Sequence, residues 1–105
     1  MSFNTFAENI RLDDGHILRA GLLNADGNVN QAEVDLNQFL GNNNGAFEWS
    51  GENFSGSAQN ISFSIEGDNV PVLRAELADA DGNFHGADIN LAERIGNDNG
   101  NFVFN

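Results

Sequence analysis

The sequence contains no cysteine and no tyrosine, and it has a single proline among its 105 residues. The absence of cysteine excludes structural disulfides, thiolate metal ligands and cysteine nucleophiles. No apolar run approaches the roughly 20 residues that a helix needs to span a bilayer, so we expect no membrane insertion. A chain of this length is large enough for one domain with one modest core, and too short for two independent domains.

Basic residues are also scarce. Four basic side chains oppose 16 acidic ones, and the formal net charge is −12. Because like charges repel at long range, this balance argues against nucleic acid or an anionic membrane surface as a partner. The first residues, Met1 to Thr5, lack the basic start and apolar stretch of a signal peptide. Together with the missing cysteine, this favours a cytoplasmic location, while secretion after loss of a leader stays open.

Asparagine and glycine, in contrast, are abundant, with 18 and 12 residues. Both residue types suit tight turns, and each asparagine amide also offers two donors and one carbonyl acceptor. The two histidines, His16 and His85, stand near predicted turns without a nucleophile motif beside them, so we expect them to be solvated. The sequence therefore predicts a turn-rich chain without an obvious catalytic group.

An internal repeat is the strongest feature of the sequence. Residues 17–49 align without a gap on residues 72–104, at an offset of 55, with 15 identities. Upstream the offset falls to 51, and the extra residues lie in a longer turn at 65–71. The repeats are thus about 1–52 and 53–105. Such a duplication is typical of a unit that cannot close its own core and is completed by its copy.

Each repeat is predicted to be built from strands, which makes the fold class all-β. Apolar and polar residues alternate at 9–12, 46–49, 60–65 and 101–104, and further strands are predicted at 16–23, 32–36, 72–78 and 87–91. Asp26-Gly27, Asp81-Gly82, Asn44-Gly45 and Asn99-Gly100 predict hairpins, because both turn residues tolerate positive φ. Short helical turns are predicted at 37–40 and 92–95, capped by Gly41 and Gly96.

The predicted core consists of the apolar residues on the inward face of these elements: Ile10, Leu18, Leu22, Val34, Leu36, Leu40, Phe47, Trp49, Phe54, Ile61, Leu73, Leu77, Ile89, Leu91, Ile95, Phe102 and Phe104.

Several strings together resemble the cyanovirin-N homologs. These are 34–37, Gly41-Asn42-Asn43-Asn44-Gly45 with Phe47 and Trp49 behind it, and Asn53-Phe54, followed by the matching strings at 89–91 and 95–100. The similarity runs from about Ser2 to the end of the chain, and the cysteine-poor composition is similar to the fungal branch of that family. The duplicated pattern in this order is specific, whereas each string alone is a weak signal.

The resemblance implies an elongated, pseudo-two-fold module in which the repeats exchange strands, with halves of about 1–39 plus 94–105 and 40–93. It implies a lectin without enzymatic activity that recognises mannose-type oligosaccharides, especially terminal α1-2-linked mannose, with no cofactor and no metal. We expect a monomer, while a domain-swapped dimer through a hinge near Trp49 to Asn53 stays open. Two disulfides of cyanobacterial members map to Ala7 with Leu22 and to Ala58 with Leu77, so packing is expected to replace them.

The resemblance also places two candidate carbohydrate-binding pockets, one near each end. Asn42 and Asn97 fall outside what a hairpin turn needs, and this favours a functional role for them. Carboxylates beside the turn amides would supply charge-assisted hydrogen bonds to sugar hydroxyls. The first and favoured pocket comprises Gly41, Asn42, Asn43, Asn44, Asn53, Ser57, Ala78, Asp79 and Asp81. The second comprises Ser2, Thr5, Asn24, Ala25, Asp26, Gly96, Asn97, Asp98 and Asn99, with fewer polar groups.

Three other functions are alternatives to a lectin. An enzyme is disfavoured, because no carboxylate sits in a predicted apolar pocket and no nucleophile is partnered. A calcium-binding module is suggested by Asp79 to Asn83, but an EF-hand needs its glycine at position 6, and here glycine is fourth. A structural or protein-interaction module that has lost its sugar sites also remains open, since fold does not fix function.

Overall fold

The computed structural model describes residues 7–67 and 69–104, and these residues form an all-β fold. The first repeat contributes an antiparallel sheet of β1 (Ala7–Asp13), β2 (Ile17–Leu23) and β3 (Val29–Asp35). The second contributes the matching sheet of β6 (Ala58–Glu66), β7 (Val70–Ala78) and β8 (Phe84–Asn90). Two hairpins follow these sheets: β4 (Leu40–Asn43) with β5 (Ala46–Trp49), and β9 (Ile95–Asp98) with β10 (Asn101–Phe104).

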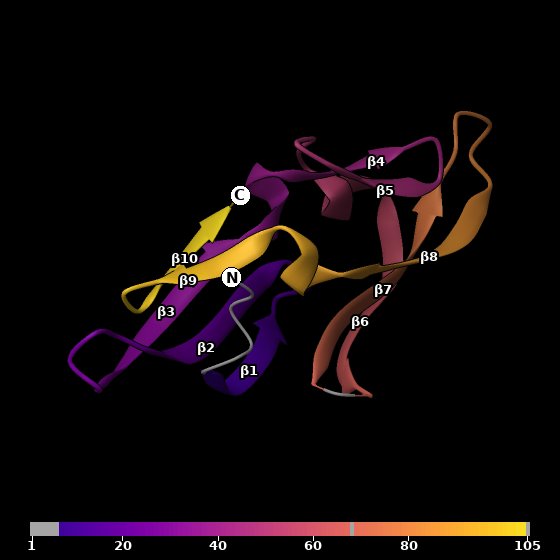
Figure 1. Cartoon of the computed structure of the whole chain (residues 1–105). Coiled ribbons are helices and arrows are strands. Elements are labelled where there is room, and N and C mark those ends of the chain that lie inside the picture. The colour runs from indigo at the N-terminus through magenta and orange to yellow at the C-terminus, as the bar shows by residue number, and fades with distance from the viewer. Residues whose placement is uncertain (1–6, 68, 105) are drawn as a thin grey trace.

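The two hairpins and the two three-stranded sheets make an elongated molecule of 50 × 24 × 22 Å. Hairpin β9–β10 lies beside the first sheet, where β10 contacts β3. Hairpin β4–β5 lies beside the second sheet, where β5 contacts β8 (Figure 1). Each hairpin thus approaches the sheet of the other repeat. The predicted halves, 1–39 plus 94–105 and 40–93, would give such an arrangement, and that division stays a prediction.

The short helical turns begin one residue before their predicted positions. They are the 3-10 helices η2 (Leu36–Gln38) and η4 (Leu91–Glu93), and a third, η3 (Phe54–Ser57), was not predicted. Asp35 and Asn90 set the starts, because their side chains accept hydrogen bonds from the second helical residue. The prediction that Gly41 and Gly96 cap these turns is wrong, since both glycines are buried inside β4 and β9.

The hairpin turns are of two kinds. Asn44 and Gly45 both have positive φ, of 51° and 95°, as predicted for a two-residue turn that matches the strand twist. The hairpin predicted at Asp26-Gly27 forms between β2 and β3, but only the glycine has positive φ, so it is not a two-residue turn. The connection spans residues 24–28 instead, closed by a 2.8 Å bond from the backbone N–H of Asn24 to the carbonyl of Asn28. The loop at 79–83 repeats this geometry.

The core is made mainly of leucines from both repeats. Nine of the predicted core residues are fully buried: Leu18, Leu22, Leu36, Leu40, Phe54, Leu73, Leu77, Leu91 and Ile95. Ala20 and Ala75 are also buried and were not predicted, because their small side chains gave no hydrophobic signal. The remaining predicted residues are only partly buried, since they lie on edge strands or on the short hairpins: Ile10, Val34, Phe47, Trp49, Ile61, Ile89, Phe102 and Phe104.

Two cross-strand pairs occupy the positions at which cyanobacterial relatives were expected to carry disulfides. Ala7 is the register partner of Leu22 in β1 and β2, and Ala58 is the partner of Leu77 in β6 and β7. Both leucines are completely buried. Apolar packing therefore joins the two strands at each of these positions. No helix among the described residues is long and apolar enough to cross a membrane.

Candidate carbohydrate-binding site

The Asn42 side chain fastens the β4–β5 hairpin to the second sheet. Its Oδ1 accepts a 2.9 Å hydrogen bond from the backbone N–H of Gly45, and its Nδ2 donates to Ser57 Oγ and to the carbonyl of Ala78, both at 2.8 Å. The first bond supports the turn itself, so the expectation that Asn42 falls outside the needs of the turn is wrong. All the hydrogen-bonding groups of this half-buried amide are engaged.

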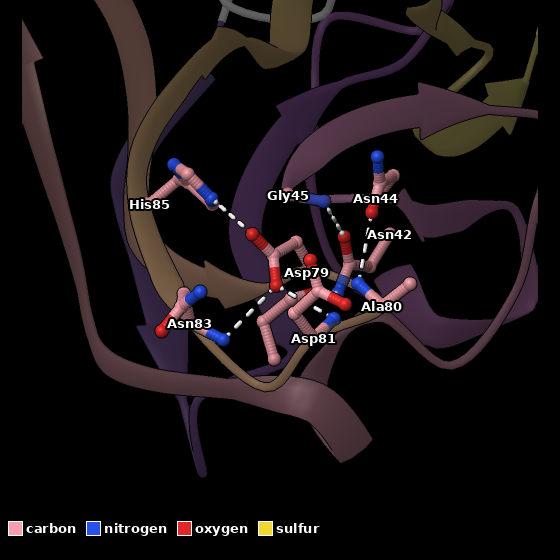
Figure 2. Close-up of polar contacts among 9 residues, drawn as sticks. Asn42, Asn44, Gly45, Asp79, Ala80, Asp81, Asn83 and His85 are labelled. Atoms are coloured by element: carbon pink, nitrogen blue, oxygen red, sulfur yellow. Dashed lines mark hydrogen bonds and ion pairs between the residues drawn. The ribbon is translucent and has the colours of Figure 1, made fainter.

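Asn44, at the tip of the same hairpin, reaches the loop between β7 and β8. Its Oδ1 accepts a 2.8 Å hydrogen bond from the backbone N–H of Ala80. Figure 2 shows the two asparagines of the hairpin facing the loop that carries Asp79, Ala80 and Asp81. Two side chains from one turn therefore hold two segments that are 36 residues apart in the sequence.

Asp79 organises the facing loop. Its Oδ1 accepts hydrogen bonds from the backbone N–H groups of Asp81 and Asn83 at 2.9 and 3.0 Å, and its Oδ2 lies 2.6 Å from His85 Nε2 (Figure 2). The hydrogen bond with His85, followed by the bond from the Asn83 N–H, lowers the pKa of Asp79 below its ordinary value. Asp79 therefore stays ionised at neutral pH.

His85 is a part of this site that the sequence did not reveal. We expected both histidines to be solvated. The His85 side chain is 54% exposed but also pairs with Asp79, and His16, whose side chain is 29% exposed, pairs with Asp35 at 2.8 Å. The His85 ring also lies over Gly45, where an added Cβ would come within 2.8 Å of its Cδ2. The one sequence signal for such a role is its position in the repeat, where His85 is the equivalent of Asn30.

The remaining predicted residues of the first pocket lie around the contacts made by Asn42, Asn44 and Asp79. Asn53 is exposed, adopts a left-handed backbone with φ of 59°, and bridges Gly41 in an antiparallel β-bridge. Asn43, on β4, and Asp81, on the loop between β7 and β8, are also exposed. Among the described residues, no side-chain hydrogen bond is recorded for the Asp81 carboxylate or the Asn53 amide. The structure thus places all nine predicted residues on the hairpin and the segments around it. Some of them form hydrogen bonds that hold the hairpin to the second sheet, and others are exposed polar groups.

The second predicted pocket has the same set of hydrogen bonds between the hairpin asparagines and the facing loop. Asn97 Oδ1 accepts from the backbone N–H of Gly100 at 2.8 Å, its Nδ2 donates to the carbonyl of Leu23 at 3.0 Å, and Asn99 Oδ1 accepts from Ala25 at 2.7 Å. Asn24 takes the place of Asp79 and accepts from the N–H groups of residues 26 and 28, each at 3.0 Å. Ser2 and Thr5, predicted to close this pocket, lie outside the described residues. The others, including Gly96, Asp98 and Asp26, lie on the β9–β10 hairpin or the facing loop.

Charge distinguishes the two sites. The first site has the Asp79 carboxylate hydrogen-bonded to His85, whereas the equivalent residues at the second are the uncharged Asn24 and Asn30. Asn30 instead donates a 2.7 Å hydrogen bond to the carbonyl of Gly100. Within residues 7–67 and 69–104, no group of three or more acidic, histidine or cysteine side chains could hold a metal ion. The two sites therefore present amides, carboxylates and backbone groups, which are suited to hydroxyl ligands.

The two hairpins, each held to the sheet of the other repeat by asparagine side chains, make a duplicated all-β module with two equivalent polar sites. The family model of the CVNH domain matches residues 3–103, so the chain belongs to the cyanovirin-N homolog family, whose members are non-enzymatic lectins.

Fungal relatives agree with this assignment over nearly the whole chain. The solution structure of the Gibberella zeae homolog is 52% identical, covers 97% of this chain and 95% of its own, and superposes with a TM-score of 0.92. A designed cyanovirin-N homolog lectin is 45% identical, with 100% of both chains covered and a TM-score of 0.94. The cyanovirin-N homolog of Neurospora crassa is 43% identical over 107 residues, which is 97% of this chain and 96% of the relative.

Two more distant structures carry ligands. Microvirin in complex with mannobiose has a TM-score of 0.88, and a variant of MoCVNH3 in complex with (N-GlcNAc)4 has a TM-score of 0.82. Each is 24% identical to this chain, so for this protein these two likenesses establish the fold alone.

Proposed function

We propose that this protein binds mannose-type oligosaccharides, with terminal α1-2-linked mannose as the preferred unit, at the first site. Membership of a lectin family supports the general activity, and the fixed geometry around Asn42 and Asn44 supports the choice of site. The single observation that carries the proposal is the double fastening of the hairpin, through the carbonyl of Ala78 and the N–H of Ala80. This fastening places exposed polar groups at fixed positions before any ligand arrives.

The chemistry of the exposed groups fits a polyhydroxylated ligand. Asp81 offers a carboxylate that accepts two vicinal hydroxyl donors, and charge-assisted bonds of this kind are the strongest available contacts. Asn53 and Asn43 offer amides that both donate and accept, so they can bond to hydroxyls in either direction. Because these groups are held on hairpin and loop backbones that are already joined, binding requires little ordering of the protein.

A titration of the labelled protein with α1-2-mannobiose tests this proposal. We expect the backbone amides of 41–45 and 79–83 to shift in the nuclear magnetic resonance spectrum. In an Asn53→Ala/Asp81→Ala variant we expect these shifts to be lost. The variant removes two polar side chains that make no hydrogen bond with the described part of the chain, and it keeps the contacts of Asn42 and Asn44 that hold the hairpin. Asp26→Ala is the matched control, since Asp26 is the repeat equivalent of Asp81 and lies at the other end of the molecule.

The same titration separates the two sites. Shifts confined to 96–100 and 24–28 would transfer the activity to the second site, and would contradict the preference for the first. No shift at either hairpin would contradict the proposal as a whole. Linkage preference follows from the ratio of dissociation constants for α1-2-, α1-3- and α1-6-mannobiose, and a ratio near one would contradict the proposed α1-2 preference.

A further inference from the structure

The outer face of the second sheet carries features that the hairpin sites do not use. Alternate residues of β7 are buried, and the residues between them, including Arg74, Glu76 and Ala78, face outward. Their register partners on β8 are Asp88, Gly86 and Phe84. Phe84 is 47% exposed, which is unusual for an aromatic ring on a polar sheet face.

A shallow, open hollow of about 390 Å³ lies on this face, lined by Glu76, Gly86 and Asp88 among others. Phe84 is not part of its lining but stands two residues before Gly86 in β8, so the alternation of the strand places both on the same face. Gly86 forms its floor, and a Cβ added there would have no heavy atom within 4 Å. The carboxylate of Glu76 at its edge is held by Gln59 Nε2 at 2.9 Å and by Asn60 Nδ2 at 2.6 Å, both on Oε1. Among the described residues, no hydrogen bond is recorded for Glu76 Oε2 or for the Asp88 carboxylate.

The equivalent surface of the first sheet is filled. Gly21 stands in the place of Glu76, and an added Cβ there would meet side-chain atoms of Val29 at 2.7 Å, Glu8 at 3.0 Å and Gln31 at 3.2 Å. Gln31 stands in the place of Gly86, and Val29 stands in the place of Phe84. The hollow and its aromatic neighbour therefore belong to the second repeat alone.

We propose that this hollow is a third ligand site, which binds a pyranose unit of an oligosaccharide. The ring would lie against Phe84, because the C–H face of a sugar is apolar and an aromatic face accepts it. Two hydroxyls would donate to Glu76 Oε2 and to Asp88, which stand on neighbouring strands beside the floor glycine. Asn60 and Gln59 hold Glu76 in its rotamer before the ligand arrives.

The combination of groups selects the ligand class. A carboxylate pair on a protein of net charge −12 repels anions, and a site of one aromatic ring plus hydroxyl acceptors is poorly suited to an apolar partner. Arg74, which also lines the hollow, forms a salt bridge with Glu66 and faces its register partner Asp88, so acidic side chains balance its charge. The inference takes its ligand class from the proposed function, but the site lies on a different surface from the hairpins.

The experiment is a titration of the labelled full-length protein with α1-2-mannobiose and, separately, with (N-GlcNAc)4. Gly86 and Asp88 are the reporters, because Phe84 pairs with Ala78 and would also sense the first hairpin site. We expect shifts at both reporters with at least one probe, with a dissociation constant on the order of 1 mM. Gly86→Gln, which restores the residue found at the equivalent place in the first repeat, is expected to weaken this binding by about tenfold or more.

The outcomes separate this site from the hairpin sites. Reporter shifts that vanish in Gly86→Gln, while shifts at 41–45 persist, support the third site; reporter shifts that survive in Gly86→Gln overturn it. Reporters that stay silent with both probes overturn it as well, whether or not the hairpins respond. If Gly86→Gln perturbs the fold, Phe84→Val with Asp88→Asn replaces it under the same criteria. Shifts produced by calcium chloride and not by either sugar would reassign the carboxylates to a cation and overturn the proposal.

Discussion

Replacing Asn42 with alanine tests the claim that this residue fastens the hairpin. The change removes three hydrogen bonds of 2.8 to 2.9 Å, to Gly45, Ser57 and Ala78. A net value of about 1 kcal/mol per hydrogen bond gives a loss of about 3 kcal/mol in the free energy of unfolding. That is a large part of the roughly 5–15 kcal/mol expected for a domain of this kind.

The duplicated fold supplies the matched control. Asn97 occupies the equivalent position, and with the residues that the structure describes its side chain makes two hydrogen bonds, to Gly100 and to Leu23. Asn97→Ala should therefore cost about 2 kcal/mol, about 1 kcal/mol less than Asn42→Ala. The difference is the bond to Ser57, so Ser57→Ala should cost about 1 kcal/mol in the parent protein and nothing further in Asn42→Ala.

Urea unfolding, followed by tryptophan fluorescence, measures the parent, the three single variants and the double variant Asn42→Ala/Ser57→Ala, whose midpoint should equal that of Asn42→Ala. The midpoints should fall in the order parent, Ser57→Ala, Asn97→Ala and Asn42→Ala, with unchanged slopes. The corresponding melting temperatures should differ by about 4–8 °C per kcal/mol for a domain of about this size. Equal midpoints for Asn42→Ala and the parent would refute the reasoning, because Asn42 would then be free for a ligand and would not hold the fold.

Three further predictions address packing and charge. An Ala7→Cys/Leu22→Cys variant should form a disulfide, since the two residues are register partners, and its oxidised form should be about 3 kcal/mol more stable than its reduced form in urea. Gly41→Ala should lower stability by about 1–3 kcal/mol, because its Cβ would lie 2.9 Å from Glu52 N, whereas Gly86→Ala should be neutral by the same assay. Hydrogen bonds from Arg74 and, second, from Ser64 lower the pKa of Glu66 from 4.5 to about 2. The ionised Glu66 therefore stabilises the fold fully above pH 4.5, and this stabilisation is lost as the pH falls toward 2. In Arg74→Gln the pKa of Glu66, measured by carboxyl resonance titration, should return toward 4.5, and an unchanged value would contradict the role of the pair.

The local sequence was sufficient for the strands and the two-residue turns. Residues 46–49 and 101–104 are strands with the predicted bounds, because alternation over a short segment depends only on which side chains meet water. The positive φ of Asn44 and Gly45 followed from their residue types. The family and the all-β class also followed, because the duplicated strings keep their order and spacing over the whole chain.

The roles of individual polar side chains were decided by contacts between distant segments. Asn42 and Asn53 are both asparagines in turn-rich sequence, yet Asn42 is engaged by Ala78, 36 residues away, while Asn53 remains exposed. His85 became part of the first site only because β8 carries it over Gly45. The open floor at Gly86 likewise depends on which neighbours reach it. Local propensity was enough for the backbone at Asn44-Gly45, but an amide or a carboxylate is free or occupied according to the partner that the tertiary fold places within about 3 Å of it. For these residues only the folded chain supplies that partner.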